Sequence, residues 1–188
     1  MTAIVGISGS LRRGSYNSAL LREAAALAPD GCEIEVASIA GIPPYDQDRQ
    51  EAEGFPPPVA ALKDRVAACD GLLIATPEYN WGIPGVAKNA IDWLSRPADD
   101  MARVFGDLPV GLIGAGGRGG TRYAQAAWLH VFRYLHVRPW FGEALFATNA
   151  WELFDRSGQL TDPKIRELLE RYVTGFAAFC TEHPRQRL

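Results

Sequence analysis

The sequence predicts an α/β domain with a parallel sheet and helices on both of its faces. Three observations lead to this fold class. The chain has 188 residues, of which 47% are hydrophobic and 22% are charged, and this suits one globular domain with a sizeable core. Short apolar runs alternate along the chain with amphipathic segments of helical period. Loops rich in glycine, proline and serine separate these segments, and such a β-α alternation indicates parallel strands.

The first part of the chain supplies two strands around a helix. Residues 3–8 form the apolar run AIVGIS, which suits a buried strand and is followed by glycine and serine. Residues 15–28 form the first helix, because leucines and alanines recur there every three or four positions, and Pro-Asp-Gly at 29–31 ends it. Residues 32–39 alternate apolar and polar side chains, which predicts a strand at an edge of the sheet.

The middle of the chain repeats this alternation. A long loop rich in proline and charge is expected at 40–58, and an amphipathic helix at 58–70. The apolar run GLLIAT at 71–76 is typical of a central strand that is buried on both faces. A loop at 77–85 then leads into a helix at 86–96.

The last part of the chain completes the sheet. The run LPVGLIG at 108–114 predicts a further central strand, and a glycine loop leads from it into a helix at 121–136. A fifth strand is expected within 137–147. The final helix spans 161–180 and opens with the capping sequence Thr-Asp-Pro.

Composition and charge exclude several classes of protein. Nineteen basic against 22 acidic residues give a net charge of −3, whereas nucleic-acid binders usually carry a basic excess. No stretch approaches the roughly 20 apolar residues of a membrane span, and the N-terminus lacks a signal-peptide pattern. Cys32, Cys69 and Cys180 show no C-x-x-C spacing, so we expect reduced thiols and a cytoplasmic location. No cluster has the spacing of metal ligands, and no metal site is expected.

Three loops of unusual composition follow the predicted strands, at 9–17, 77–85 and 114–120. The first is rich in hydroxyl groups and arginine, the second in proline and aromatic residues, and the third in glycine. Because the carboxyl ends of parallel strands meet at one edge of a sheet, we expect these loops to form a single ligand site there.

The loop GSLRRGSYN at 9–17 predicts a phosphate site. Ser10, Ser15 and Asn17 offer neutral donors, and Arg12 adds a charge-assisted hydrogen bond. The unpaired amides and the dipole at the start of the following helix also attract an anion. This set of donors suits a phosphate monoester.

Other interpretations of the glycine and serine patterns stay open. Gly9 and Gly14 have the spacing of an NTPase P-loop, although Ser15 stands where that loop needs a lysine. Alternatively, Ser15 or Asn17 only caps the helix. A G-x-G-x-x-G pattern at 114–119 lies outside the first βα turn, where a dinucleotide fold would carry it, so we interpret its glycines as backbone that approaches a flat ligand closely.

Four segments carry a resemblance to a known family: GSLRRGSYN, IPPYDQD, TPEYNWGIPGVAKNAIDWLSR and the glycine loop before GGTR. Over residues 3–180 the chain resembles the NAD(P)H-dependent FMN reductases, which include flavin, quinone, chromate and azo-dye reductases. The resemblance implies a single flavodoxin-like FMN-binding domain over residues 1–188, with a five-stranded parallel sheet in the order 2-1-3-4-5 and helices on both faces. It also implies FMN as the cofactor and NADPH or NADH as the co-substrate.

The resemblance assigns cofactor contacts residue by residue. Ser10, Arg12, Ser15 and Asn17 would hold the phosphate, and Tyr16 would line the ribityl chain. Pro77, Glu78, Tyr79 and Asn80 would border the isoalloxazine and the ribityl chain, largely through backbone groups. The loop 114–119, with Ala115, Gly116 and Gly117, would edge the pyrimidine side of the ring. The chain departs from the family pattern at 115–117, where a serine or proline is usual. It also departs at Trp81, whose bulk suggests a cover over part of the ring or a narrowed substrate entrance.

The implied chemistry needs no catalytic side chain. The flavin takes a hydride from the nicotinamide and reduces an acceptor in a ping-pong scheme, the acceptor being a quinone or free flavin, or a chromate, azo or nitro compound. Backbone N–H groups of the two ring-bordering loops would stabilise charge near flavin N1, and Arg118 is a candidate ligand for the NADPH phosphate. Two alternatives stay open: a flavodoxin-type electron carrier without a nicotinamide site, and a nucleotide-binding or phosphate-transfer protein.

The predicted helix 121–136 carries a wide stripe of aromatic and aliphatic side chains that allows two interpretations. Either the stripe packs wholly in the core, or part of it joins Trp81 and Trp93 in a subunit interface, since large exposed aromatic patches usually mark contacts. Together with the resemblance, the second interpretation favours a homodimer or homotetramer. His130 and His136 are expected at the surface or at such an interface.

Overall fold

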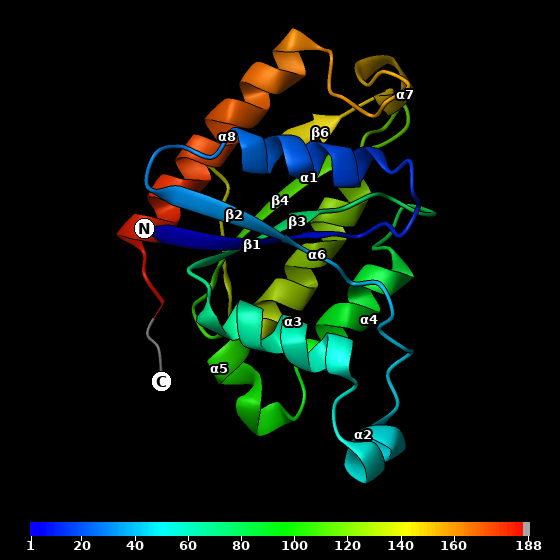
Figure 1. Ribbon diagram of the computed structural model, residues 1–188, viewed down its shortest axis with the longest axis vertical. Helices are drawn as coiled ribbons and strands as arrows, with labels where there is room; N and C mark the ends of the chain where they lie inside the picture. The colour runs from blue at the N-terminus through cyan, green and yellow to red at the C-terminus, as the bar shows by residue number, and fades with distance from the viewer. Residues whose placement is uncertain (186–188) are drawn as a thin grey trace.

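The computed structural model describes residues 1–185 and contains a parallel sheet between two layers of helices (Figure 1). The strand order is β2-β1-β3-β4-β5, and β6 pairs with a later part of β4. This arrangement confirms the flavodoxin-like class and the predicted strand order. The strands are β1 (Thr2–Ser8), β2 (Cys32–Ala37), β3 (Gly71–Ala75), β4 (Pro109–Ala115), β5 (Arg138–Pro139) and β6 (Leu145–Ala147).

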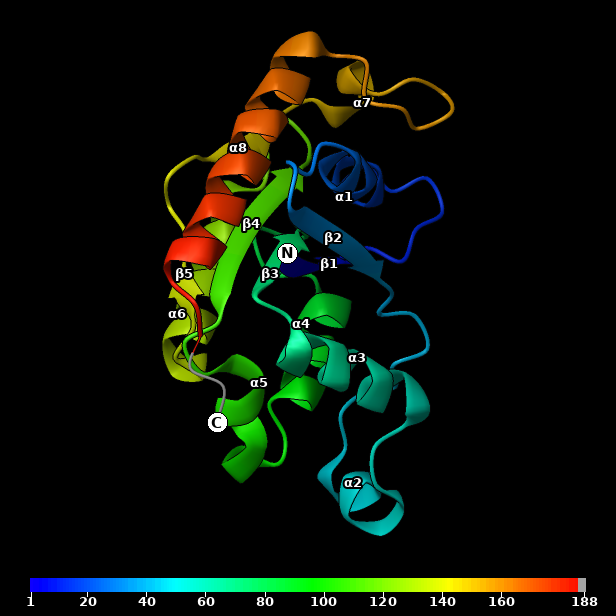
Figure 2. The same cartoon turned by 60° about the vertical axis from the view of Figure 1, so that its left-hand side comes forward.

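Helices cover both faces of the sheet (Figure 2). Each face has its own hydrophobic core. Alternation along the strands feeds both cores: Ile4 and Leu73 point to one face, and Val5 and Leu72 to the other. In residues 1–185 no helix combines the length and hydropathy needed to cross a bilayer. One face is covered by α1 (Tyr16–Ala26) and α8 (Pro163–Glu182), the other by α3 (Pro57–Ala68), α4 (Gly85–Leu94), α5 (Met101–Phe105) and α6 (Arg122–Leu135).

The burial of each strand follows its position in the sheet. All five residues of β3 are buried, as expected for a strand with neighbours on both sides. In β2, Ile34 and Ala37 are buried while Glu33 and Glu35 are exposed, and β2 pairs only with β1. The alternation read from residues 32–39 therefore correctly placed this strand at an edge.

The fifth strand expected within 137–147 is divided into β5 and β6. Both pair with β4, and the amide of Trp140 still donates to the carbonyl of Val110 at 2.9 Å, but residues 141–144 leave the sheet between the two strands. Trp140 packs edge-on against Tyr172 of α8 at 4.7 Å between ring centroids. Gly175 makes room for this indole, since a Cβ there would lie 2.7 Å from it. The interruption follows from packing against α8, which a local sequence pattern does not report.

Several short helices were not predicted. Residues 47–53 form α2 (Gln47–Glu53) inside the segment expected to be a loop, and the side chain of Asp46 caps it by accepting from the amide of Arg49. None of its residues is buried, so it lacks the apolar period that signals a helix. The other unpredicted elements are a 3₁₀ turn at Ala98–Asp100, α5, and α7 (Ala150–Leu153).

The expectation that Trp93 lies in a subunit interface is wrong. Its side chain is fully buried, its Nε1 donates to the carbonyl of Pro43 at 2.8 Å, and Tyr45 packs edge-on against it at 5.0 Å. Asn89, one turn earlier in α4, also donates to Pro43 and accepts from the amide of Tyr45. These two residues therefore anchor the segment that follows β2.

The aromatic stripe of α6 divides between core and surface. Trp128 and Phe132 are buried against the sheet, with their ring centroids 5.7 Å apart. Tyr123 and Tyr134 are exposed, as are His130 and His136. Core packing thus explains the inner half of the stripe and leaves the outer half free to contact something else.

Candidate cofactor site

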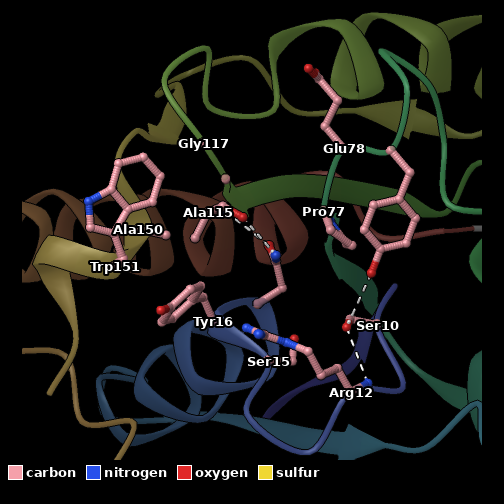
Figure 3. A pocket seen from close by; sticks show the side chains of 13 residues that line it. Ser10, Arg12, Ser15, Tyr16, Pro77, Glu78, Ala115, Gly117, Ala150 and Trp151 are labelled. Atoms are coloured by element: carbon pink, nitrogen blue, oxygen red, sulfur yellow. Dashed lines mark hydrogen bonds between the residues drawn. The ribbon is translucent and has the colours of Figure 1, made fainter. Parts of the chain in front are cut away.

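The three loops expected to form one site do meet, at the carboxyl edge of β1, β3 and β4 (Figure 3). They surround a cavity of about 370 Å³. Eleven of the twelve residues predicted to bind the cofactor line it, and Asn80 is the exception. The lining residues are Ser10, Arg12, Ser15, Tyr16, Asn17, Pro77, Glu78, Tyr79, Ala115, Gly116, Gly117, Ala150 and Trp151.

The start of α1 presents unpaired donors to this cavity. Ser15 is the N-cap and accepts from the amide of Ser18 at 3.2 Å. Within residues 1–185, the amides of Tyr16 and Asn17 have no acceptor. Two free amides at the positive end of an 11-residue helix create a site for an anion.

Arg12 adds a positive charge to the same end of the cavity. Its Nη2 donates to the carbonyl of Gly14 at 2.6 Å, and its guanidinium lies 5.2 Å from the ring centroid of Tyr16. No ion pair within the described chain involves Arg12, so its charge is not neutralised by a carboxylate. The buried hydroxyl group of Ser10 lies beside it and accepts from the phenol of Tyr79 at 3.5 Å.

Asn17 joins the phosphate-type loop to the glycine loop. Its Nδ2 donates to the carbonyl of Ala115 at 2.8 Å, and its Oδ1 accepts from the amide of Ala115 at 2.9 Å. The side chain is buried, and the two partners are 98 positions apart in the sequence. Asn17 therefore holds two walls of the cavity at a fixed separation.

Residues 79–82 form a tight hairpin turn at the rim of the cavity. Tyr79 and Gly82 exchange both backbone hydrogen bonds, at 3.3 and 3.0 Å. Asn80 and Trp81 have left-handed backbone angles, with φ of 51° and 60°, as the commonest two-residue hairpin requires. The turn leaves both side chains exposed, which explains why Asn80 does not line the cavity. Trp81 is 75% exposed and packs on Tyr123 at 5.4 Å.

Glu78 points away from the centre of the cavity towards α6 (Figure 3). Its Oε2 accepts from the amides of Tyr123 and Ala124, at 2.8 and 3.0 Å. Thr121, the N-cap residue of α6, makes no side-chain cap of its own. The cap thus comes from a loop 45 positions earlier in the chain, where no capping pattern would reveal it.

The glycines of the loop 114–120 serve two purposes. A Cβ on Gly114 would lie 2.1 Å from the hydroxyl of Thr121, and one on Gly116 would lie 2.4 Å from the carbonyl of Gly120. These two glycines are required by close approaches within the chain itself. A Cβ on Gly117 would meet nothing within 4 Å, so this position leaves open space beside the cavity.

Ala150 and Trp151 complete the cavity and were missed by sequence reasoning. The amides of Asn149 and Ala150 donate to the carbonyls of Gly117 and Gly116, at 3.0 and 2.9 Å, and this fixes α7 to the glycine loop. Trp151, at 53% exposure, lies on the same side of the cavity as Tyr16, away from Ser10 and Pro77 (Figure 3). A tryptophan in a segment without a periodic pattern carried no signal for this placement.

Comparisons with known proteins agree with this geometry. A family model described as NADPH-dependent FMN reductase matches residues 2–152. The chain belongs to this family. An NAD(P)H-dependent FMN reductase of Pseudomonas aeruginosa is 46% identical over 171 residues, covering 90% of each chain. A 2-hydroxy-1,4-benzoquinone reductase of a Burkholderia species is 36% identical over 177 residues, covering 94% of each chain.

A solved structure extends the likeness to three dimensions. The flavoenzyme NAD(P)H:acceptor oxidoreductase FerB of Paracoccus denitrificans superposes with a TM-score of 0.85 at 29% identity, covering 98% of this chain and all of that one. As a member of the FMN reductase family, the chain is an oxidoreductase that uses FMN as its cofactor and NAD(P)H as its co-substrate.

The residues that line the cavity fit FMN. At one end, two free helix amides, two serines and the unneutralised Arg12 suit a phosphate monoester. At the other end, residues 115–117 and 77–79 line the cavity, and the glycine loop places no bulky side chain there. The cavity volume also falls in the range of roughly 300–1,000 Å³ that is usual for cofactor sites.

Proposed function

We propose that residues 1–188 act as one flavodoxin-like domain that reduces quinones with NAD(P)H by way of FMN held in this cavity. The observation that carries the proposal is that one cavity has a cationic, amide-rich end and a second end lined by two other loops. The Burkholderia relative, whose name specifies 2-hydroxy-1,4-benzoquinone, and a probable NADPH:quinone oxidoreductase of rice at 36% identity support a quinone as the acceptor.

The proposed roles of the residues follow from their positions. The hydroxyl groups of Ser10 and Ser15, the guanidinium of Arg12 and the amides at the start of α1 would bind the phosphate. Tyr16 and Trp151 would flank the cofactor on one side. The backbone of 77–79 and of 115–117 would border the isoalloxazine, and Asn17 would position the second of these segments rather than bind the phosphate with its side chain.

When bound, FMN supplies the redox chemistry by accepting a hydride and later reducing the acceptor. The chain itself binds the cofactor, orients it and shields it from water. Arg12 and the helix amides would hold the phosphate and offset its charge, and the backbone amides of 77–79 and 115–117 would stabilise negative charge on a ring placed beside them. No side chain in this arrangement acts as an acid or base, which suits a ping-pong scheme in which donor and acceptor use one open face in turn.

Anaerobic mixing with NADPH or NADH tests the proposal directly. We expect the protein to bind FMN, the flavin absorption to bleach on mixing, and a quinone to restore it. Binding of FMN without bleaching by either nicotinamide would instead identify a flavodoxin-type carrier. Parallel runs with free flavin, chromate, azo and nitro compounds would rank the acceptors.

We also propose that the chain forms a homodimer or homotetramer in the cytoplasm. Three large aromatic side chains are exposed in this region. Trp81 lies at the cavity rim and packs on Tyr123, and Tyr123 and Tyr134 lie on the outer half of α6. Such exposed aromatic residues often lie in protein contacts. All three cysteines are free thiols, which supports a reducing compartment. Light scattering coupled to size exclusion measures the assembly, and a monomer at micromolar concentration would contradict the first part.

A further inference from the structure

Glu78 takes part in two features of the fold, the cofactor cavity and the start of α6. It lines the cofactor cavity, and its carboxylate occupies the N-terminus of α6 through the amides of Tyr123 and Ala124. The ion pairs within residues 1–185 involve other carboxylates, so no basic side chain neutralises this charge. Within the described residues, the two amides and the helix dipole stabilise it.

This position has an electrostatic consequence for the cofactor. Two electrons and one proton convert oxidised FMN into its reduced anion, so reduction adds negative charge to the ring. The N-terminus of α6 would favour that charge, but Glu78 already occupies it with a full negative charge. The carboxylate points from the cavity towards α6, but its residue lines the site, and a fixed negative charge there opposes a second one nearby.

We propose that Glu78 is a positioning residue that fixes the 77–82 loop against α6 and also lowers the reduction potential of bound FMN. The inference rests on the proposed placement of the isoalloxazine beside residues 77–79. A lower potential makes the reduced cofactor a stronger donor towards its acceptor. The residue would thus tune the reaction without taking part in hydride transfer.

The variant Glu78→Gln separates the two roles. Its amide oxygen still accepts from Tyr123 and Ala124, but the charge is lost. The protein's preference for reduced over oxidised FMN is the ratio of the two dissociation constants. We expect this preference to be about tenfold greater in Glu78→Gln than in the parent protein. The measurement is the midpoint potential of the bound flavin, determined by spectroelectrochemistry against a reference dye, and it should rise.

Asp162→Asn is a matched control. Asp162 is also a capping carboxylate, because its Oδ1 accepts from the amide of Ile165 at 2.9 Å at the start of α8, and it does not line the cavity. We expect the apoprotein of this variant to lose about as much thermal stability as the apoprotein of Glu78→Gln does. The midpoint potential of its bound flavin should stay unchanged. A rise in potential as large as that of Glu78→Gln would overturn the proposal.

The variant Glu78→Asp separates the effect of the negative charge from the effect of the side-chain length. Aspartate keeps the negative charge but is one methylene too short to span the same distance, so stability should fall while the potential stays near the parental value. If Glu78→Asp raises the potential and Glu78→Gln does not, geometry rather than charge is responsible and the proposal fails. The proposed function is judged separately, by whether the parent protein binds FMN and bleaches with NAD(P)H.

Discussion

Arg12 carries a positive charge that the described part of the chain leaves without a carboxylate partner. Asn17, the second residue of α1, has the opposite character, since both ends of its amide are occupied by Ala115. The first residue is free to meet a ligand, whereas the second maintains the shape of the cavity. Substitutions at the two positions should therefore affect different quantities.

Replacing Arg12 with alanine should weaken FMN binding by about 1.5–3 kcal/mol, the range for a hydrogen bond to a charged group. The dissociation constant is measured by the quenching of flavin fluorescence on binding. Arg13→Ala is the control, because Arg13 is an exposed neighbour that does not line the cavity. Equal losses from both variants would show a general charge effect and remove Arg12 from the phosphate site.

Replacing Asn17 with alanine should lower the free energy of unfolding of the apoprotein by about 2–4 kcal/mol, because the buried amide and carbonyl of Ala115 both lose their partners. Urea titration followed by circular dichroism measures this change. Asn17→Asp keeps the acceptor for the Ala115 amide but not the donor, so it should also be destabilised. Unchanged stability in Asn17→Ala would show that the bridge contributes nothing before the cofactor binds.

At the scale of elements, the glycine loop after β4 is shaped by its own neighbours. Its first glycines lie against Thr121 and Gly120, while the amides that begin α7 hold its carbonyls. The loop is therefore a fixed wall in the described chain before any ligand arrives. Two glycines of the same loop provide a paired test of this statement.

Gly114→Ala should destabilise the apoprotein by about 3 kcal/mol, since the new methyl group would collide with Thr121 and with the carbonyl of Thr76. Gly117→Ala adds the same group in open space and should leave the apoprotein's stability unchanged. Thermal melts of the two apoproteins give the comparison. Similar melting temperatures for both would mean that the loop relaxes easily and is not a fixed wall.

At the scale of the whole molecule, an ionic cluster joins the elements on the face of the sheet that carries α3. Lys63 is almost completely buried and pairs with Asp100 at 2.8 Å, and Arg103 pairs with the same carboxylate at 2.6 Å. The hydrogen bond from Arg103, with a further contribution from Lys63, lowers the pKa of Asp100 to about 2. The cluster links α3 to α5 through Asp100, the last residue of the 3₁₀ turn that directly precedes α5.

The low pKa of Asp100 predicts a loss of stability in acid. The carboxylate stabilises the fold fully above its unfolded pKa of about 3.9, and this contribution disappears as the pH falls through about 2. Urea midpoints measured between pH 5 and pH 2 should therefore decline in the parent protein. Asp100→Asn should start from a lower midpoint at pH 5 and decline less. An equally steep decline in both would assign the acid sensitivity to other groups.

The sequence by itself determined the long helices, the first four strands and the edge of the sheet at which the site lies. Apolar periods are local, and residues 3–8, 32–39 and 71–76 therefore revealed their strands without knowledge of their neighbours. The composition of three loops, together with the rule that parallel strands end at one edge, predicted a single ligand site there, and eleven of the contacts that the family resemblance implies line its cavity. The resemblance of the same motifs to a known family supplied the cofactor.

Only the tertiary structure decided which partner each polar group takes. The cap of α6 by Glu78 and the bridge from Asn17 to Ala115 join residues far apart in the chain, and Trp151 reaches the cavity because the glycine loop holds α7. Trp93 is buried by a proline-rich segment that its own helical period does not reveal. Such contacts depend on how whole elements pack, and packing is set by shape and burial over long sequence separations rather than by local pattern.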